Sequence, residues 1–200
     1  VLALLGCLAS YGAFSQATVN HPLNFNAGTF TVTTPPPAGN FNYYDNGGVA
    51  GNYGTNMFYL GNAVTFAPSN STNFRVRATF SSFTVENGWD PLYIFNSNVA
   101  GTNQVQGGGA VPIQGGAPAG GFYNNPGTII ANQGAAAVGA NAAECLSFSF
   151  VSDGSVTFAG WAAVIDQVAK INCNLIQPGN VTISASTTGC PGPVSVNAPA

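Results

Sequence analysis

The chain has 200 residues, and three Lys and Arg against six Asp and Glu give it a formal net charge of −3 at neutral pH. Nucleic-acid binding requires a basic patch that neutralises phosphates. A chain with only three cations cannot form such a patch, so this function is excluded. A hydrophobic fraction of 46%, with 26 Gly and 13 Pro, favours a folded protein of strands and turns over one of long helices.

Residues 1–17 have the features of an export signal peptide. An apolar run at the start leads into small residues and ends at Phe14-Ser15-Gln16-Ala17, where cleavage is expected. The alternatives are a buried strand or a short core helix, and the context of Cys7 also resembles a lipid-attachment signal. Beyond Ala17 no stretch reaches about 18 consecutive apolar residues, so we predict no transmembrane span in the mature chain.

A lead-in segment follows over residues 18–40. It contains one predicted strand, at 30–33, which the proline run at 35–37 ends because proline cannot donate to a sheet. Immediately after it, Asp45-Asn46-Gly47-Gly48 indicates a turn, since Asn and Gly tolerate positive φ.

Residues 41–173 contain the main run of predicted strands. The clearest spans 73–86, where apolar and polar residues alternate, and Ser81-Ser82 breaks the alternation as a β-bulge would. Cys145 to Val151 also alternates, with Ser147 and Ser149 predicted to face outward. Other predicted strands lie at 92–95, 128–130 and 160–168.

The stretch from 100 to 143 is rich in Gly and Ala and reads mainly as surface loops. Forty residues without secondary structure are unusual in a compact domain, so we expect one or two further strands there. Residues 135–137 indicate a weak helical turn. Many short strands without helical periodicity predict an all-β sandwich, with a barrel as the alternative.

Residues 174–200 differ from the preceding part and contain two short predicted strands joined by a turn. Two strands cannot bury a core alone, so this tail is interpreted as the start of a second domain. The four cysteines match no zinc-binding spacing. Cys145 and Cys173 flank one β-rich segment and are predicted to form a disulfide, which leaves Cys190 to pair outside the 200 residues.

Residues 41–173 resemble a CUB-like domain of exported Bacteroidetes proteins. The resemblance rests on four pieces in order along the chain: Tyr44-Asp45-Asn46-Gly47-Gly48 with Asn52-Tyr53, then Phe80 to Glu86, then Asp90-Pro91-Leu92-Tyr93-Ile94-Phe95, then Leu146 to Asp153 with Gly160-Trp161. It implies a jelly-roll β-sandwich that binds protein or glycan without catalysis. Phe95-Asn96-Ser97 departs from the "YDG" usual in the family.

The tail from Pro178 resembles the opening of a hyalin-type repeat, which is an Ig-like adhesion module. Tandem repeats of this kind occur in giant bacterial surface adhesins, including those of gliding cells. The export signal ending in Phe-Ser-Gln fits the same bacterial group and implies type IX secretion. The resemblance therefore implies the surface of a Gram-negative bacterium, with secretion and outer-membrane machinery as partners.

Calcium binding is the most specific chemical hypothesis that the sequence supports. Some CUB domains bind Ca²⁺ with one Glu and two Asp at one end of the sandwich, and Glu86, Asp90 and Asp153 occupy the matching places. The alternative is that Asp90 and Asp153 cap turns through bonds to the backbone. Asp45 is interpreted as a turn residue.

A catalytic function has little support in the sequence. His21 is the only histidine, and neither a nucleophile elbow nor a paired-histidine metal motif is present, so we predict no enzyme activity. Tyr43 and Trp89 are candidate ligand-contact aromatics, whereas Trp161 is predicted to be buried.

The leading hypothesis is the N-terminal binding module of a large repeat-containing adhesin. The alternatives are an accessory domain of a secreted hydrolase and a subunit of a surface filament, which would exchange strands between copies.

Overall fold

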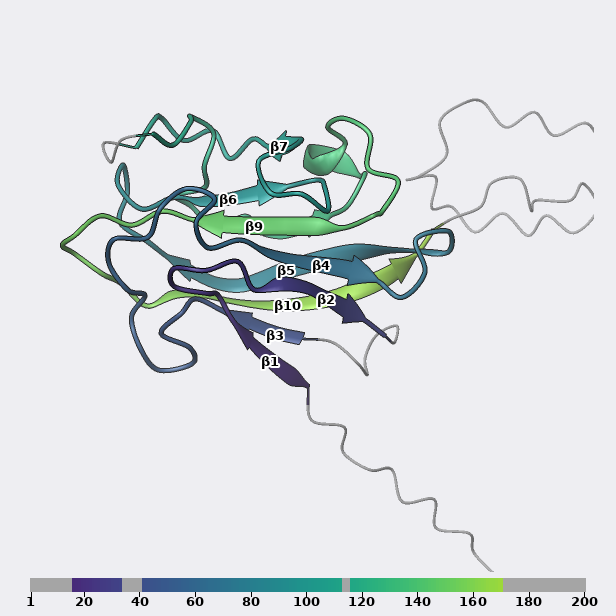
Figure 1. The fold of residues 1–200 in the computed structure, drawn as a ribbon, viewed down its shortest axis with the longest axis horizontal. Coiled ribbons are helices and arrows are strands. Elements are labelled where there is room, and N and C mark those ends of the chain that lie inside the picture. Colours follow the sequence, from purple (N-terminus) through teal and green to yellow (C-terminus); the bar gives the residue numbers. More distant parts are fainter. Residues whose placement is uncertain (1–15, 34–40, 113–115, 171–200) are drawn as a thin grey trace, which may run out of the picture.

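Figure 1 shows two β-sheets packed face to face in a computed structural model that describes residues 16–33, 41–112 and 116–170. Each sheet has five strands, so the predicted all-β sandwich is confirmed. The first sheet has the order β1-β3-β10-β5-β8 and the second β2-β4-β9-β6-β7. The strands are β1 (Ala17–Asn20), β2 (Gly28–Val32), β3 (Phe41–Tyr44), β4 (Val64–Pro68), β5 (Phe74–Thr84), β6 (Leu92–Phe95), β7 (Gln104–Val105), β8 (Thr128–Ile130), β9 (Leu146–Phe150) and β10 (Gly160–Ala169).

The described part of the lead-in segment, up to Thr33, belongs to the sandwich. Its strand β1 pairs in parallel with β3, and its strand β2 pairs in parallel with β4, whereas the other strand pairs in both sheets are antiparallel. The sandwich therefore begins before Phe41, where the sequence places its start, because both strands bury side chains between the sheets.

The core forms where alternating apolar side chains of the two sheets meet. Phe148 and Phe150 of β9 face Tyr43 and Trp161 of the opposite sheet, with ring centroids 5.2 Å apart for Tyr43–Phe148 and 5.0 Å for Phe150–Trp161. Trp161 is buried, as predicted. The predicted bulge is also present, because the pairing of β5 with β10 skips Ser81 between Phe80 and Ser82.

The outer face of β9 is covered, which alternation alone does not reveal. Ser147 and Ser149 point away from the core as predicted, yet both are fully buried. Ser147 Oγ donates to the Ser97 carbonyl at 2.7 Å, and Ser149 Oγ bonds to Asn62 Oδ1 at 3.1 Å. Loops thus lie over this face, and small hydroxyls satisfy their polar groups.

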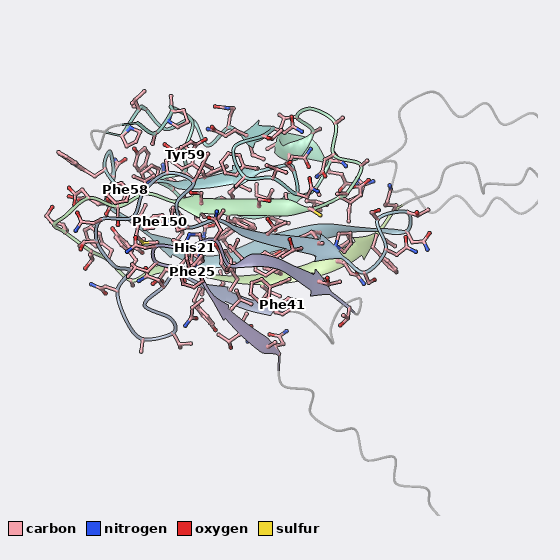
Figure 2. The ribbon with its side chains drawn as sticks, viewed as in Figure 1. His21, Phe25, Phe41, Phe58, Tyr59 and Phe150 are labelled. Atoms are coloured by element: carbon pink, nitrogen blue, oxygen red, sulfur yellow. The ribbon has the colours of Figure 1, made fainter. Side chains whose placement is uncertain are left out.

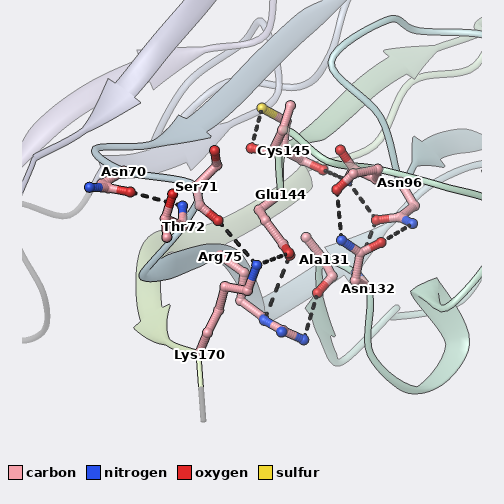
Figure 3. A network of polar contacts seen from close by, with 12 residues as sticks. Asn70, Ser71, Thr72, Arg75, Asn96, Ala131, Asn132, Glu144, Cys145 and Lys170 are labelled. Carbon is pink, nitrogen blue, oxygen red and sulfur yellow. Dashed lines mark hydrogen bonds and ion pairs between the residues drawn. The ribbon is translucent and has the colours of Figure 1, made fainter. Parts of the chain in front are cut away.

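The Gly- and Ala-rich stretch contains the expected hidden strand, β7, and a short 3-10 helix, η1 (Gly134–Ala136). A set of asparagine amides holds it against the sheet. Asn141 Nδ2 donates to Asn96 Oδ1 at 2.8 Å, and Asn96 Nδ2 donates to Asn132 Oδ1 at 2.9 Å (Figure 3). These amide bonds add to the core contacts that the segment makes through buried side chains such as Phe122 and Ile129.

Cys145 is buried directly before β9, and burial raises the pKa of its thiol to about 11, with the charge of Glu144 adding to the effect. Within the described residues Cys145 forms no disulfide, and its predicted partner Cys173 lies outside them.

Two predicted segments also lie outside the described residues. They are the signal peptide over 1–15 and the Ig-like tail over 174–200. Among the described residues, none of the helices has the length and hydropathy needed to cross a bilayer.

A carboxylate cluster as candidate cation site

The three residues predicted to bind calcium lie at the end of the sandwich where β5 and β9 finish and β6 begins. This end is on the left in Figure 1. Glu86 follows β5, Asp90 precedes β6, and Asp153 follows β9. Because β6 and β9 are antiparallel and Leu92 pairs with Phe150, the start of one strand and the end of the other lie together. The tight turn between Glu86 and Asp90 then brings the end of β5 to the same place, with Asp90 N donating to the Glu86 carbonyl at 3.0 Å.

The three carboxylates converge. One ligand oxygen from each of Glu86, Asp90 and Asp153 lies within 4.8 Å of the other two. Asp90 is at the centre of the cluster and is fully buried. Its Oδ1 accepts a hydrogen bond from the Asp153 backbone N–H at 2.9 Å, and its Oδ2 accepts one from the Tyr53 hydroxyl at 2.8 Å. The cluster, named here the carboxylate triad, is therefore built around Asp90.

Burial raises the pKa of Asp90 to about 6. Hydrogen bonds from the Asp153 N–H and the Tyr53 hydroxyl act against this rise, and the negative charges of Asp153 and Glu86 contribute to it. A carboxyl with such a pKa carries a costly negative charge at neutral pH. A bound cation would remove that cost.

Free coordination capacity remains within the triad. Glu86 Oε2 is buried and has no hydrogen-bond partner among the described residues. Each oxygen of Asp90 accepts one hydrogen bond and keeps a second lone pair. Carboxylate oxygens are hard ligands of the kind Ca²⁺ prefers, so the donor set fits this ion.

Asp153 also plays the capping role that the alternative interpretation assigned to it. Its Oδ1 accepts hydrogen bonds from the backbone N–H of Ser155 at 2.8 Å and from the Ser155 hydroxyl at 3.0 Å. These bonds form a local turn at the surface. They fix the direction of the carboxylate and leave its Oδ2 with a single contact, to the Ser155 hydroxyl at 3.2 Å.

The positive charges of the chain lie at the opposite end of the sandwich. Arg75 and Lys170 both pair with the buried Glu144, at 3.7 and 2.6 Å (Figure 3). Arg77 Nε donates to Asp166 Oδ1 at 2.8 Å, and the two residues are direct cross-strand partners on β5 and β10. All three Lys and Arg residues are thus paired away from the triad, which has no cationic neighbour within the described ranges.

Tyr43 is not a surface aromatic, contrary to the sequence-based prediction. It is fully buried, and its hydroxyl lies 2.7 Å from His21 Nδ1. The adjacent turn made it look exposed, but the turn begins only at Asp45, which accepts a hydrogen bond from Gly47 N at 2.7 Å. Asp45 is therefore the turn residue that was predicted. Trp89 lies half-buried in the turn next to the triad and remains a candidate contact.

His21 is a buried core residue (Figure 2). Its Nε2 lies 3.1 Å from Asn62 Oδ1, and its ring lies 5.5 Å from that of Trp161. Burial lowers its pKa to about 4, although the hydrogen bond with Asn62 acts in the opposite direction. The only histidine of the chain is thus neutral and shielded from solvent at neutral pH.

Two residues with central places in the polar contacts were not singled out by the sequence. Tyr53 donates to Asp90 and accepts a hydrogen bond from the Glu86 backbone N–H at 3.0 Å, so it connects two members of the triad. Glu144, which binds two of the three cations, sits in the left-handed region at φ 55°. The only signal for Tyr53 was its place in the motif Asn52-Tyr53.

No protein-family profile matches the chain, and no curated protein matches it. Among solved structures, the full extracellular region of zebrafish Gpr126/Adgrg6 is similar over 70% of the chain, with a TM-score of 0.42 and 16% identity. The match covers 15% of that receptor chain.

Proposed function

We propose that the chain is a non-catalytic extracellular binding module whose carboxylate triad holds a calcium ion. The observation that carries this proposal is the triad itself. Three carboxylates converge at one end of the sandwich, one buried carboxylate oxygen has no partner, and the cations of the chain are paired elsewhere. Like charges so close together repel each other unless a cation neutralises them.

In this proposal Glu86, Asp90 and Asp153 hold the ion, and waters or nearby carbonyls complete the six to eight oxygens that Ca²⁺ takes. The ion would tie the turn after β5 to the loop after β9 and so fix a rigid surface at this end of the molecule. Trp89, in that turn, is the candidate aromatic for a protein or glycan ligand.

The non-catalytic part of the proposal is supported by His21. A general base must reach a substrate proton and keep a pKa near the working pH. His21 is buried against Tyr43 and Asn62, and burial holds its pKa at about 4. The remaining acids outside the triad serve the Asp45 turn and the ion pairs of Glu144 and Asp166.

We further propose that this module forms the N-terminal part of a large repeat-containing bacterial surface adhesin. Support comes from the sequence: the export signal, the resemblance of residues 41–173 to exported CUB-like domains, and the resemblance of the tail to a hyalin-type repeat. Calcium-dependent rigidity at an exposed end would suit a module that contacts surface ligands.

Calcium binding is tested by titration calorimetry and by the melting temperature in Ca²⁺ and in EDTA. The wild-type chain should bind one Ca²⁺ and melt at a higher temperature in its presence. Asp90→Asn and Glu86→Gln should abolish both effects. The matched control is Asp166→Asn, which removes an acid at the opposite end and should lower stability while keeping the calcium-dependent shift. Equal melting temperatures of the wild type in Ca²⁺ and EDTA would refute the proposal.

The adhesin proposal is tested separately, by the mass of the native polypeptide recovered from the cell surface under reducing conditions. A polypeptide many times longer than 200 residues, with Ig-like repeats in its peptide map, is expected. A short native polypeptide would contradict it and favour the filament subunit.

A further inference from the structure

The two lateral sides of the sandwich differ in the length of their edge strands and in whether other segments cover them. On one side the edge strands are β7 and β8, which are two and three residues long. The chain after β7 folds back on itself, with Gly107 N donating to the Gly120 carbonyl at 2.8 Å. The short helix η1 lies beside both strands (Figure 1). Short, covered edges of this kind resist pairing with another sheet.

On the other side the edge strands are β1 and β2, which are four and five residues long. Neither contains a charged residue or a proline, the residues that natural edge strands commonly use to block pairing. β2 reads Gly-Thr-Phe-Thr-Val and pairs with β4 in unbroken register. Its Thr29 and Thr31 are exposed, while Phe30 packs against Phe66 at 5.8 Å between centroids. Within the described ranges β2 pairs only with β4, so its other side is a regular, uncharged edge.

Charge is distributed along the strand axis of the whole sandwich, over both of its sheets. Four acids, Asp45, Glu86, Asp90 and Asp153, lie at the end where β9 finishes, and none of them pairs with a cation within the described ranges. The three cations lie toward the opposite end with Glu144 and Asp166, so three positive and two negative charges leave that end with a net charge of +1, against −4 at the acidic end. Because β2 is parallel to β4 and β4 is antiparallel to β9, β2 runs from the acidic end to the cationic end.

We infer that the β2 edge is an interaction surface for a second copy of this chain. A twofold axis beside β2 pairs the strand with its own copy in antiparallel orientation and joins the two five-stranded sheets into one. The same rotation sets the acidic end of each copy beside the cationic end of the other. The uncharged edge thus permits pairing, and the charge distribution selects the antiparallel arrangement.

The association is expected to be weak, because one strand pair buries less than the roughly 800 Å² per partner of a standard interface. Sedimentation velocity of the full chain in EDTA, over a concentration series up to the solubility limit, should show a monomer–dimer equilibrium. EDTA separates this result from calcium binding. Raising the salt concentration should shift the equilibrium toward monomer, because screening weakens the end-to-end attraction.

The decisive variant is Thr31→Lys, which places like charges near each other across the twofold axis. It should remain monomeric at every concentration. Thr128→Lys is the matched control, since it adds the same charge to an exposed threonine of the covered edge strand β8, and it should dimerise like the wild type. Far-UV circular dichroism confirms that both variants fold. A wild type that stays monomeric, or a Thr31→Lys variant that dimerises equally well, would overturn the inference.

Discussion

The Tyr53 hydroxyl donates a hydrogen bond to Asp90 Oδ2 at 2.8 Å, and both groups are buried. The same hydroxyl accepts a hydrogen bond from the Glu86 backbone N–H at 3.0 Å. A single side chain from the connection between β3 and β4 therefore orients two acids at the end of β5. Groups that orient metal ligands in this way commonly change metal affinity when they are removed.

Replacing Tyr53 by Phe should weaken calcium binding while leaving the triad in place. The Phe ring fills the same space, but the Asp90 carboxylate loses one bond and the Glu86 N–H loses its acceptor. We expect the calcium dissociation constant to rise by about 10- to 100-fold, measured by titration calorimetry. The control is Tyr59→Phe, because the Tyr59 ring packs on Tyr93, 4.8 Å away between centroids, and not on the triad. Equal affinities of the two variants would contradict the orienting role.

Calcium binding should weaken in mild acid. Burial raises the pKa of Asp90 to about 6, so below this pH the proton competes with the ion for the carboxylate. With one competing proton, the apparent affinity should fall about tenfold between pH 7 and pH 5. Calorimetry at pH 7, 6 and 5 in buffers of equal ionic strength measures the change. An affinity independent of pH over this range would show that Asp90 does not bind the ion.

The strands that could be predicted from the sequence include those whose apolar and polar residues alternate, and also the short apolar strand β6. β5 and β9 alternate strictly, so their position, direction of burial and even the bulge at Ser81 follow from the pattern. β4 was missed because it is only five residues long, ends at Pro68 and has no exposed residue that would mark a polar face. β1 was missed because it begins at Ala17, which the sequence assigns to the signal peptide.

The triad was predicted because its members sit next to recognisable strands in the family-like order, which fixes them at one end of a sandwich. Tyr43 was misplaced because sequence near a turn does not show which side chain enters the core. The cluster of Arg75, Glu144 and Lys170 joins segments far apart in the chain, and no local pattern encodes such a contact. Pairing between distant segments is decided by the tertiary fold.

Glu144 should be important for stability. It is buried at a positive φ and pairs with Arg75 and Lys170, so Glu144→Gln leaves two cations without a counter-charge. We expect a loss of roughly 2–3 kcal/mol in the free energy of unfolding, measured by urea denaturation. In a Lys170→Gln background the same substitution should lower the free energy of unfolding by less, because one of the two cations that pair with Glu144 has already been removed. Strictly additive effects would show that the pair is not coupled.

His21 should make the protein less stable as the pH falls below 6.5. Burial lowers its pKa from 6.5 to about 4 in the folded protein, so between these values the unfolded chain binds a proton that the folded chain does not. This contribution is complete above pH 6.5, is lost as the pH falls toward 4, and amounts to roughly 3 kcal/mol. Asp45 and Asp90 act in the opposite direction, because burial raises the pKa of each to about 6 and folding then favours their protonated forms below that pH.

The contribution of His21 is isolated by comparing the wild type with His21→Gln. Urea denaturation in EDTA at pH 7.5, 6, 5 and 4.5 gives the free energy of unfolding of both proteins. The two aspartates contribute equally to both curves, so the difference between them reports on residue 21 alone. The advantage of the wild type at pH 7.5 should shrink by most of those roughly 3 kcal/mol by pH 4.5. Parallel curves would mean that His21 is not held neutral by burial in the core beside Tyr43 and Asn62.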